Sequence, residues 1–299
     1  MKNLLNIVNG ISNPASQIRF APYGQRELFR VLQDNILCRN EISRRKQALD
    51  RIVSEPICDI DEDRGYALVG ANGNRERLSG AIDEGRALLK TADVEAKIRG
   101  KKYLVSILPD TGLKKESEIL KLAATPWMVK TVGTYLGCLP VLTYVNVWYS
   151  RPDDHNAQVE GSQMWHLDHE DLRQIKVFVY CGDVDEQSGP LKVVNAKNSL
   201  EHIRNLRYRT TSQSKRLQDD IIPVSQQITL TGKQGSMALV DTSRCFHLGS
   251  REMKKPRLVI SLQYLGPQAY GAKNYNNFHL QRIVSETGHL FSRQLANFG

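Results

Sequence analysis

Residues 163–180 read QMWHLDHEDLRQIKVFVY and carry two signals side by side. The first is a cluster of ligating side chains, because His166, Asp168 and His169 fall within four consecutive positions. The second is the run 174–180, whose β-branched and aromatic residues predict a strand. In a strand, residues two apart point the same way, so we expect His166 and Asp168 to face one side together.

Further short strands are predicted on either side of this stretch. They lie at 141–150, 162–168, 190–194, 226–231, 236–241 and 256–265. Turn residues separate several of them, such as Ser188-Gly189-Pro190. Many short strands with turns between them indicate a closed or sandwiched β-fold.

The chain before residue 138 is predicted to be mainly helical. Residues 24–53 place Leu28, Val31, Leu32 and Ile36 on one stripe at helical spacing, as in a helix with one apolar face. Weaker helical periodicity covers 75–99, and a clearer pattern covers 116–137.

The pattern over 116–137 carries helix boundary signals. Thr125 can cap a helix, Pro126 suits its first position, and Gly137 can end it. No linker-like composition marks the change to strands near residue 140. We therefore expect a single domain over 1–299, with a mainly helical part over about 1–137, a β-core over about 138–266 and a tail at 267–299.

The amino-acid composition limits the classes of function that the chain can have. Lysine and arginine outnumber the acidic residues 41 to 32, a net charge of +9, which favours an anionic partner or equally reflects a charged surface. The five cysteines lie far apart without a CxxC motif, which argues against a disulfide framework and a zinc ribbon. With a poor signal-peptide pattern and no membrane-length apolar run, we expect a cytoplasmic protein without membrane contact.

A third metal ligand is available downstream. His247 follows the apolar run 235–241 and would complete a set of two histidines and one carboxylate with His166 and Asp168. Such a set leaves coordination positions open and suits non-haem Fe(II). His169 would point to the other strand face, so we interpret it as a turn residue or a residue on the substrate side.

Arg257 lies ten positions after His247 and begins a predicted strand. Leu258, Ile260 and Leu262 would pack in the core, while Arg257, Val259 and Ser261 would point to the other face and into a barrel interior. A guanidinium there is a natural bidentate partner for a carboxylate.

The order of these motifs resembles a known family. His166-x-Asp168, the Ser188-Gly189-Pro190 turn, the distal His247 and Arg257 resemble the Fe(II)/2-oxoglutarate dioxygenase superfamily over about residues 117–266, most closely its phytanoyl-CoA dioxygenase-like branch. In that branch a glutamine commonly precedes the HxD segment, as Gln163 does here. The chain departs from the pattern at 195–199, which lacks the Pro-Gly-Ser-His loop, and at Val259, where many relatives have serine.

The resemblance implies an α+β fold with a mainly β core, a double-stranded β-helix (jelly roll, cupin-like) with the N-terminal helices packed outside. It implies Fe(II) held by His166, Asp168 and His247, with 2-oxoglutarate and O2 as co-substrates and ascorbate helpful in vitro. Arg257 would pair with the distal carboxylate of 2-oxoglutarate, with Gln163 and Trp148 in the same pocket, although core packing explains Trp148 equally well. The implied reaction hydroxylates a small or medium organic substrate, of anionic character if the charge excess bears on it, and releases succinate and CO2.

The sequence is also consistent with other reactions and functions. The same iron site serves desaturation, epoxidation or cyclisation, and a non-catalytic metal- or ligand-binding jelly-roll protein is a further alternative. Residues 201–216 suit a basic lid or a solvated charge run, and their single aromatic, Tyr208, gives little support for nucleic-acid binding. Lys176 is interpreted as reaching a sheet edge rather than meeting an acid in the site. The sequence indicates no particular oligomeric state.

Overall fold

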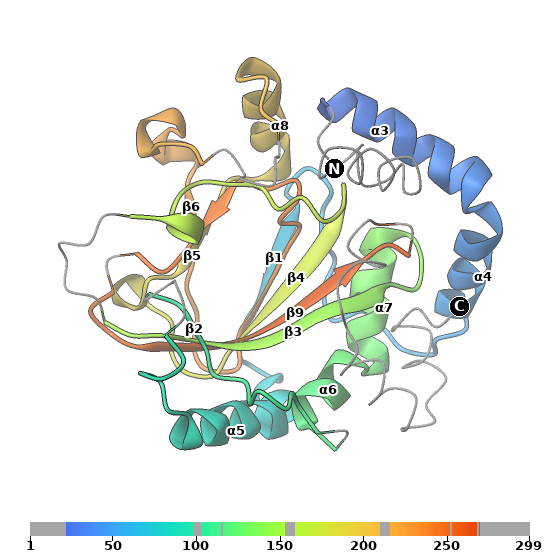
Figure 1. The fold of residues 1–299 in the computed structure, drawn as a ribbon. Coiled ribbons are helices and arrows are strands. Elements are labelled where there is room, and N and C mark those ends of the chain that lie inside the picture. Colours follow the sequence, from blue (N-terminus) through green and yellow to red (C-terminus); the bar gives the residue numbers. More distant parts are fainter. Residues whose placement is uncertain are drawn as a thin grey trace, which may run out of the picture.

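Two antiparallel sheets curve around the interior of the β-region (Figure 1). The computed structural model describes residues 22–98, 103–114, 116–152, 159–209, 216–251, 253–267 and 269. Within these residues, the six-stranded sheet has the order β1-β7-β4-β9-β3-β2 and the three-stranded sheet the order β6-β5-β8.

The strands β3, β4, β5, β6, β7 and β9 lie where the sequence predicts them, whereas β1, β2 and β8 were not predicted, and β1 and β2 lie in the part expected to be mainly helical. The large sheet contains β1 (Tyr66–Val69), β2 (Val105–Ser106), β3 (Val141–Ser150), β4 (Gln174–Tyr180), β7 (Met237–Val240) and β9 (Arg257–Leu265), and the small sheet contains β5 (Leu191–Val193), β6 (Ile228–Leu230) and β8 (His247–Leu248). The strand predicted at 162–168 is wrong. That segment holds the 3-10 helix η2 (Gly161–Gln163) and two isolated bridges, at Trp165 and His166.

The chain alternates between the sheets from β3 onward. β3 lies in the large sheet, His166 bridges to β8 of the small sheet, and β4 returns to the large sheet. β5 and β6 then lie in the small sheet, and β7, β8 and β9 alternate between the two. This winding is that of a jelly roll, so the predicted double-stranded β-helix core is confirmed.

Helices lie before the β-core and, in the case of α8 and the turns η3 to η5, between its strands. They are α3 (Tyr23–Leu32), the π-helical η1 (Gln33–Leu37), α4 (Arg39–Asp50), α5 (Arg75–Thr91), α6 (Glu118–Ala123), α7 (Pro126–Leu136) and α8 (Ala196–Asn205), with the 3-10 turns η3 (Glu186–Ser188), η4 (Asp219–Ile221) and η5 (Val224–Gln226). Thr125 occupies the N-cap of α7, Pro126 its first turn, and Gly137 ends it with φ 78°. The positions of all three signals are confirmed, although the Thr125 hydroxyl donates to the carbonyl of Leu122 and makes no capping hydrogen bond. The region predicted as helical over 24–53 is divided between α3, η1 and α4.

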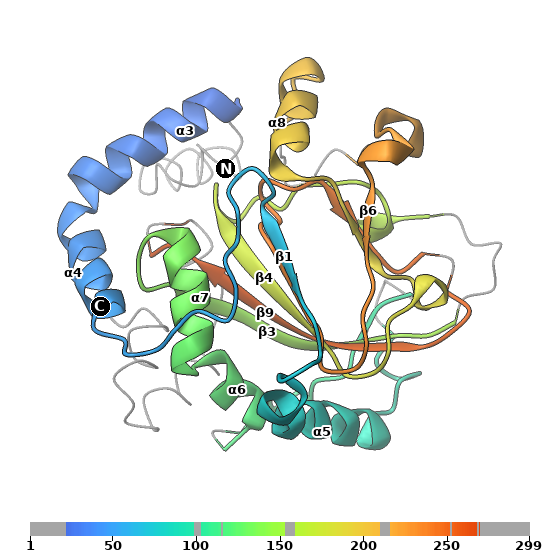
Figure 2. The same cartoon turned by 180° about the vertical axis from the view of Figure 1, so that it is seen from behind.

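The helices α5, α6 and α7 cover the outer face of the large sheet (Figure 2). Alternate residues of β4 and β9, such as Val177, Ile260 and Leu262, are fully buried against them. The helices contribute Leu78, Ile82, Ile119, Met128 and Val132 to the same cluster. Each of these side chains stabilises the fold by about 1.5–3 kcal/mol through removal from water, so the large sheet has one dry face. The opposite strand face carries both apolar residues, such as Val240 and Val259, and polar residues, such as Ser261 and Gln263.

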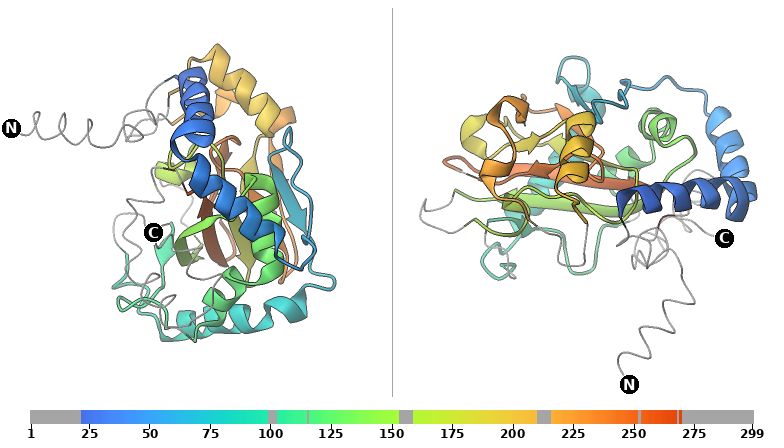
Figure 3. Two further views of the ribbon diagram at one scale, coloured as in Figure 1. Left: turned by 90° about the vertical axis from the view of Figure 1, so that its right-hand side faces the viewer. Right: turned by 90° about the horizontal axis from the view of Figure 1, so that it is seen from above.

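Helices α3 and α4 lie beside one end of the sheets (Figure 3). The apolar stripe predicted over Leu28, Val31, Leu32 and Ile36 does not pack into the core, since these residues are 43–66% exposed among the described residues. The helix is held through arginines instead: Arg26 donates to the carbonyl of Asp171, and Arg30 forms an ion pair with its carboxylate. Periodicity indicates a helix with an apolar face, and it does not identify what covers that face. In the described part of the chain, every helix is too short or too polar to cross a bilayer.

The two faces of β9 differ in their expected contribution to stability. Replacing Leu262 by alanine leaves a cavity in the dry layer and should reduce the free energy of unfolding by about 2–5 kcal/mol. Ser261→Ala, one residue earlier and facing the interior, should change it by less than about 1 kcal/mol. Urea denaturation of both variants measures the difference, and equal losses would contradict this assignment of faces.

Candidate metal and ligand site

His166 and His247 are held opposite each other by the backbone. The His166 N–H donates to the carbonyl of His247 at 3.1 Å, and the His247 N–H donates back at 3.0 Å. Directly opposed residues of an antiparallel pair share a face, and the two imidazole centroids are 4.1 Å apart. Asp168 joins them because its N–H donates to the carbonyl of Thr242 at 2.8 Å.

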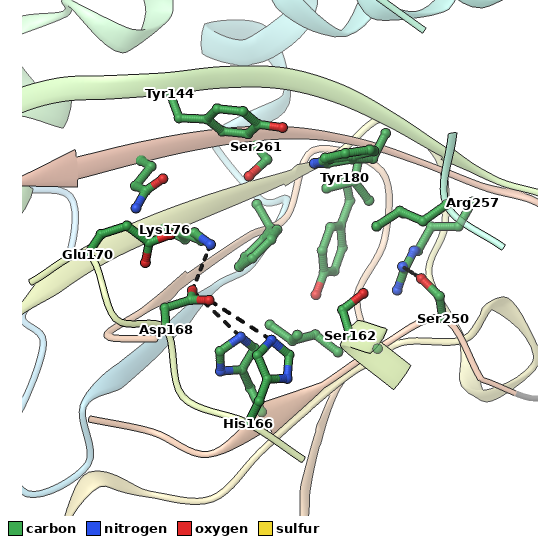
Figure 4. Close-up of a pocket in the computed structure, with 18 of the residues that line it drawn as sticks. Tyr144, Ser162, His166, Asp168, Glu170, Lys176, Tyr180, Ser250, Arg257 and Ser261 are labelled. Carbon is green, nitrogen blue, oxygen red and sulfur yellow. Dashed lines mark hydrogen bonds and ion pairs between the residues drawn. The ribbon is translucent and has the colours of Figure 1, made fainter. Parts of the chain in front are cut away.

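The three side chains converge on one point, and Figure 4 shows His166 and Asp168 facing each other. The Nε2 atoms of His166 and His247 lie 4.0 and 3.8 Å from the carboxylate oxygens of Asp168. Each Nδ1 lies near a carbonyl two residues back: 2.8 Å from Met164 O for His166 and 3.1 Å from Cys245 O for His247. A carbonyl only accepts, so Nδ1 carries the hydrogen in both rings and the Nε2 lone pairs point towards Asp168.

The charge states of the three groups suit a metal. Burial lowers the pKa of His166 well below its usual value and also lowers that of His247, so both rings are neutral at neutral pH. Burial alone would raise the pKa of Asp168, but the charge of Lys176 holds it below its usual range. Two neutral imidazoles and one carboxylate are the ligand forms that divalent metals require.

The donor set therefore fits a divalent metal. One ligand atom from each of His166, Asp168 and His247 lies within 4.8 Å of the others. Three protein donors on one side leave further coordination positions towards the interior, which is the arrangement of non-haem Fe(II) sites.

A cavity of about 360 Å³ opens beside these residues. Its aromatic wall comes from Tyr144, Trp148, Phe178 and Tyr180 of the inward face of β3 and β4. Polar lining residues include Ser162, His169, Glu170, Lys176, Arg216, Ser250, Arg257, Ser261 and Gln263. Its size is at the lower end of the range for small-molecule sites.

Arg257 lies at the far end of the cavity from Glu170 and Lys176 (Figure 4). Its Nη2 donates to Ser250 Oγ at 2.7 Å, and its Nη1 donates to the carbonyl of Gly189. Gly189 lies in the predicted Ser-Gly-Pro turn with φ +58°, and a Cβ there would lie 2.5 Å from Met253, so glycine is required. Burial lowers the pKa of Arg257 to about 10, which leaves it charged at neutral pH.

The other residues expected in the site differ in position. Trp148 and His169 line the cavity. Gln163 is buried and does not belong to the described cavity lining; its side-chain amide donates to the carbonyl of Ser250 at 2.6 Å. Gln163 thus contacts Ser250, which in turn contacts Arg257.

The position of Lys176 differs from the one predicted. The expectation that it reaches a sheet edge is wrong, because β4 is paired on both sides, by β7 and β9. Its ammonium donates to Asp168 Oδ2 at 2.6 Å, so it meets an acid in the site. The sequence feature that could have placed Lys176 in the site is the alternation along β4. Lys176 lies on the same strand face as Gln174 and Phe178, whereas the core residues Ile175 and Val177 lie on the opposite face.

Among the described residues of the basic segment 201–216, the cavity lining includes Arg216 alone. Arg204, Arg207 and Arg209 are exposed, as expected of a solvated charge run. Residues 210–215, including Lys215, lie outside the described residues. Arg216 lines the cavity. Sequence reasoning missed individual roles for Arg216, Ser250 and Glu170, which all lie outside regular strands.

The remaining histidines have no place in the site among the described residues. His202 lies in the last turn of α8, with its Nε2 2.8 Å from Gln226 Oε1. His155, His279 and His289 lie outside the described residues.

Neither a family model nor a curated protein sequence matches the chain. Among solved structures, it is similar to the epimerase SnoN in complex with Fe3+, alpha ketoglutarate and nogalamycin RO (15% identity, TM-score 0.49, 75% of this chain and 85% of that chain). It is also similar to apo EctD from S. alaskensis (15%, 0.49, 72% and 82%) and to HygX from Streptomyces hygroscopicus with nickel and 2-oxoglutarate bound (17%, 0.46, 68% and 84%). These are likenesses of shape alone.

The ion pair between Asp168 and Lys176 should contribute to the free energy of unfolding of the metal-free protein. Asp168→Ala removes the carboxylate that is hydrogen-bonded to the part-buried ammonium of Lys176 and should reduce the free energy of unfolding by about 3 kcal/mol. Adding Lys176→Met removes that charge and should recover most of the loss. Urea denaturation in the presence of a chelator measures the double-mutant cycle, and simply additive losses would show that the two groups are not coupled.

Proposed function

We propose that this chain is a 2-oxoglutarate-dependent non-haem iron oxygenase. The observation that carries the proposal is the pairing of two features in one cavity: the converging set of His166, Asp168 and His247, and the part-buried guanidinium of Arg257. The first suits Fe(II), and the second suits the distal carboxylate of a dicarboxylic co-substrate.

The residues of the cavity have different roles in the proposed reaction. His166, Asp168 and His247 would hold Fe(II), which when bound supplies the redox chemistry that couples O2 to decarboxylation of 2-oxoglutarate, yielding succinate and CO2. Lys176 keeps Asp168 ionised and fixes one of its oxygens. Tyr144, Trp148, Phe178 and Tyr180 give the cavity an apolar wall, against which an organic substrate can pack.

Ser250 supplies a hydroxyl beside Arg257. Relatives with a serine two residues after the arginine would use it towards 2-oxoglutarate, but Val259 occupies that position here. Ser250 Oγ lies 2.7 Å from Arg257 Nη2, and Ser150 Oγ lies 3.3 Å from Ser250 Oγ. Ser250 adopts φ +60°, which is uncommon for a residue with a side chain, and Gln163 donates to its carbonyl. We assign Ser250 the second contact to the carboxylate and Gln163 the task of positioning it.

The finer reaction that we propose is hydroxylation of a small organic substrate. Cavity size supports a small substrate, and the open side of the metal site supports oxidation of a group placed beside it. Desaturation, epoxidation and cyclisation use the same site, so product analysis distinguishes them.

Succinate formation tests the enzyme class. Purified protein with Fe(II), ascorbate, O2 and 2-oxoglutarate should form succinate even without its substrate, through slow uncoupled turnover. The double variant Asp168→Ala/Lys176→Met is the matched control, because it lacks a metal ligand without leaving an unpaired lysine. Succinate formation by the control at the wild-type rate would remove Asp168 from the metal site, and its absence from the wild type would reject the proposal.

Co-substrate affinity tests Arg257 and Ser250. Arg257→Ala removes charge-assisted hydrogen bonds and should raise the KM for 2-oxoglutarate roughly 10- to 100-fold, whereas Ser250→Ala should raise it less. Adding Val259→Ser to Ser250→Ala should restore affinity, because position 259 also faces the cavity. Steady-state succinate kinetics give these values, and an unchanged KM in Arg257→Ala would exclude its role.

A further inference from the structure

The cavity contains a cation that the proposed chemistry does not use. Its charged lining comprises Lys176, Arg216 and Arg257 against Asp168 and Glu170. Lys176 is bonded to Asp168, and Arg257 is bonded to Ser250 and assigned to 2-oxoglutarate. Arg216 has no role in the proposed reaction.

The backbone at Arg216 is held next to the candidate metal site. The following residue, Leu217, donates its N–H to the carbonyl of Trp165 at 2.9 Å, and Trp165 directly precedes His166. The guanidinium is close enough to Asp168 for their charges to interact. A group bound to Arg216 would therefore lie beside the candidate metal centre.

One nitrogen of Arg216 is unsatisfied. Nη1 is buried and has no hydrogen-bond partner in the part of the chain that the structure describes. A buried donor left without a partner costs about 1–3 kcal/mol, and more if it is charged, so native proteins rarely retain one without a use. A bound anion would satisfy this donor.

The charge balance indicates one further negative charge. Among the lysine, arginine and acidic side chains of the lining, three cations against two carboxylates leave one positive charge on the cavity wall. Fe(II) would add two positive charges and 2-oxoglutarate two negative charges, so the loaded cavity would keep the same excess. A ligand with a single negative charge would neutralise it, which favours a carboxylate over a phosphate monoester.

We propose that Arg216 binds the carboxylate of the substrate to be oxidised, which is therefore a small organic acid. The inference rests on the proposed function. A guanidinium offers two parallel donors that match a carboxylate, and the aromatic wall of Tyr144, Trp148 and Phe178 suits an apolar body.

Binding of small probes tests the proposal. The protein is loaded with Zn(II), which has no redox chemistry, and with 2-oxoglutarate. Benzoate, benzamide and phenyl phosphate are then titrated by calorimetry. Benzoate should bind at least about tenfold more tightly than benzamide, and more tightly than phenyl phosphate. Arg216→Met should abolish this preference without changing the affinity for 2-oxoglutarate, and Arg216→Lys should retain part of it.

Arg204→Met is the matched control, since it removes an exposed arginine of the same basic segment. It should keep the preference for benzoate. Arg216→Met should also be at least as stable as the wild type towards urea without ligand, because it removes a buried unsatisfied donor. An arginine with a purely structural role would instead lower stability when replaced.

Three results would overturn the proposal: equal binding of benzoate and benzamide, a preference that survives in Arg216→Met, or tighter binding of phenyl phosphate. The titration is repeated without Zn(II) and 2-oxoglutarate to separate the two proposals. Arg216-dependent benzoate binding together with absent succinate formation would reject the iron chemistry and keep the carboxylate site.

Discussion

The reciprocal hydrogen bonds between His166 and His247 are the constraint on which the site depends. They link a segment without regular strand structure to the two-residue strand β8. The bridge sets the spacing of the two rings, and each ring is oriented by a carbonyl two residues earlier in its own segment. The spacing of the rings and the tautomer of each ring are thus set by backbone groups.

The third candidate ligand depends on a separate network that reaches the outer helices. Asp168 is anchored to Thr242, which follows the buried Asp241. The carboxylate of Asp241 accepts from Tyr135 of α7 at 2.7 Å and from the N–H groups of Ser243 and Arg244. Burial raises the pKa of Asp241 to about 6, so these donors are needed to keep it in place when ionised. The helical layer therefore supports the loop that positions Asp168, besides covering the sheet.

The period-two pattern of the long strands was sufficient to predict their faces. It identified Leu258, Ile260 and Leu262 as core residues and Arg257 as pointing inward, because alternation is a local property of a strand. The environment of Lys176 could not be predicted in the same way. Whether a lysine meets a sheet edge or a carboxylate depends on strand order, which is set by contacts distant in sequence.

The residues missed in the cavity share another cause. Ser250 and Arg216 lie in irregular segments, where no periodicity indicates side-chain direction. The wrong strand at 162–168 has the same origin, since that segment adopts a 3-10 turn and makes only single bridges. The HxD motif still identified His166 and Asp168, because its two residues converge through individual backbone hydrogen bonds that a short bridge can provide.

The cavity brings together charges that oppose folding. Placing Lys176, Arg216 and Arg257 in one interior costs desolvation, which a single ion pair with Asp168 offsets only in part. The dry layer between the large sheet and its helices supplies the stability that tolerates this arrangement. Stability and ligand recognition are thus assigned to opposite faces of the same strands. A residue such as Val177 packs on the dry face while Lys176, its neighbour in β4, faces the cavity. A substitution that shifted β4 by one residue relative to its neighbours would exchange these roles, burying the charge and exposing the core residue, so the pairing of β4 with β7 and β9 preserves the core and the site together.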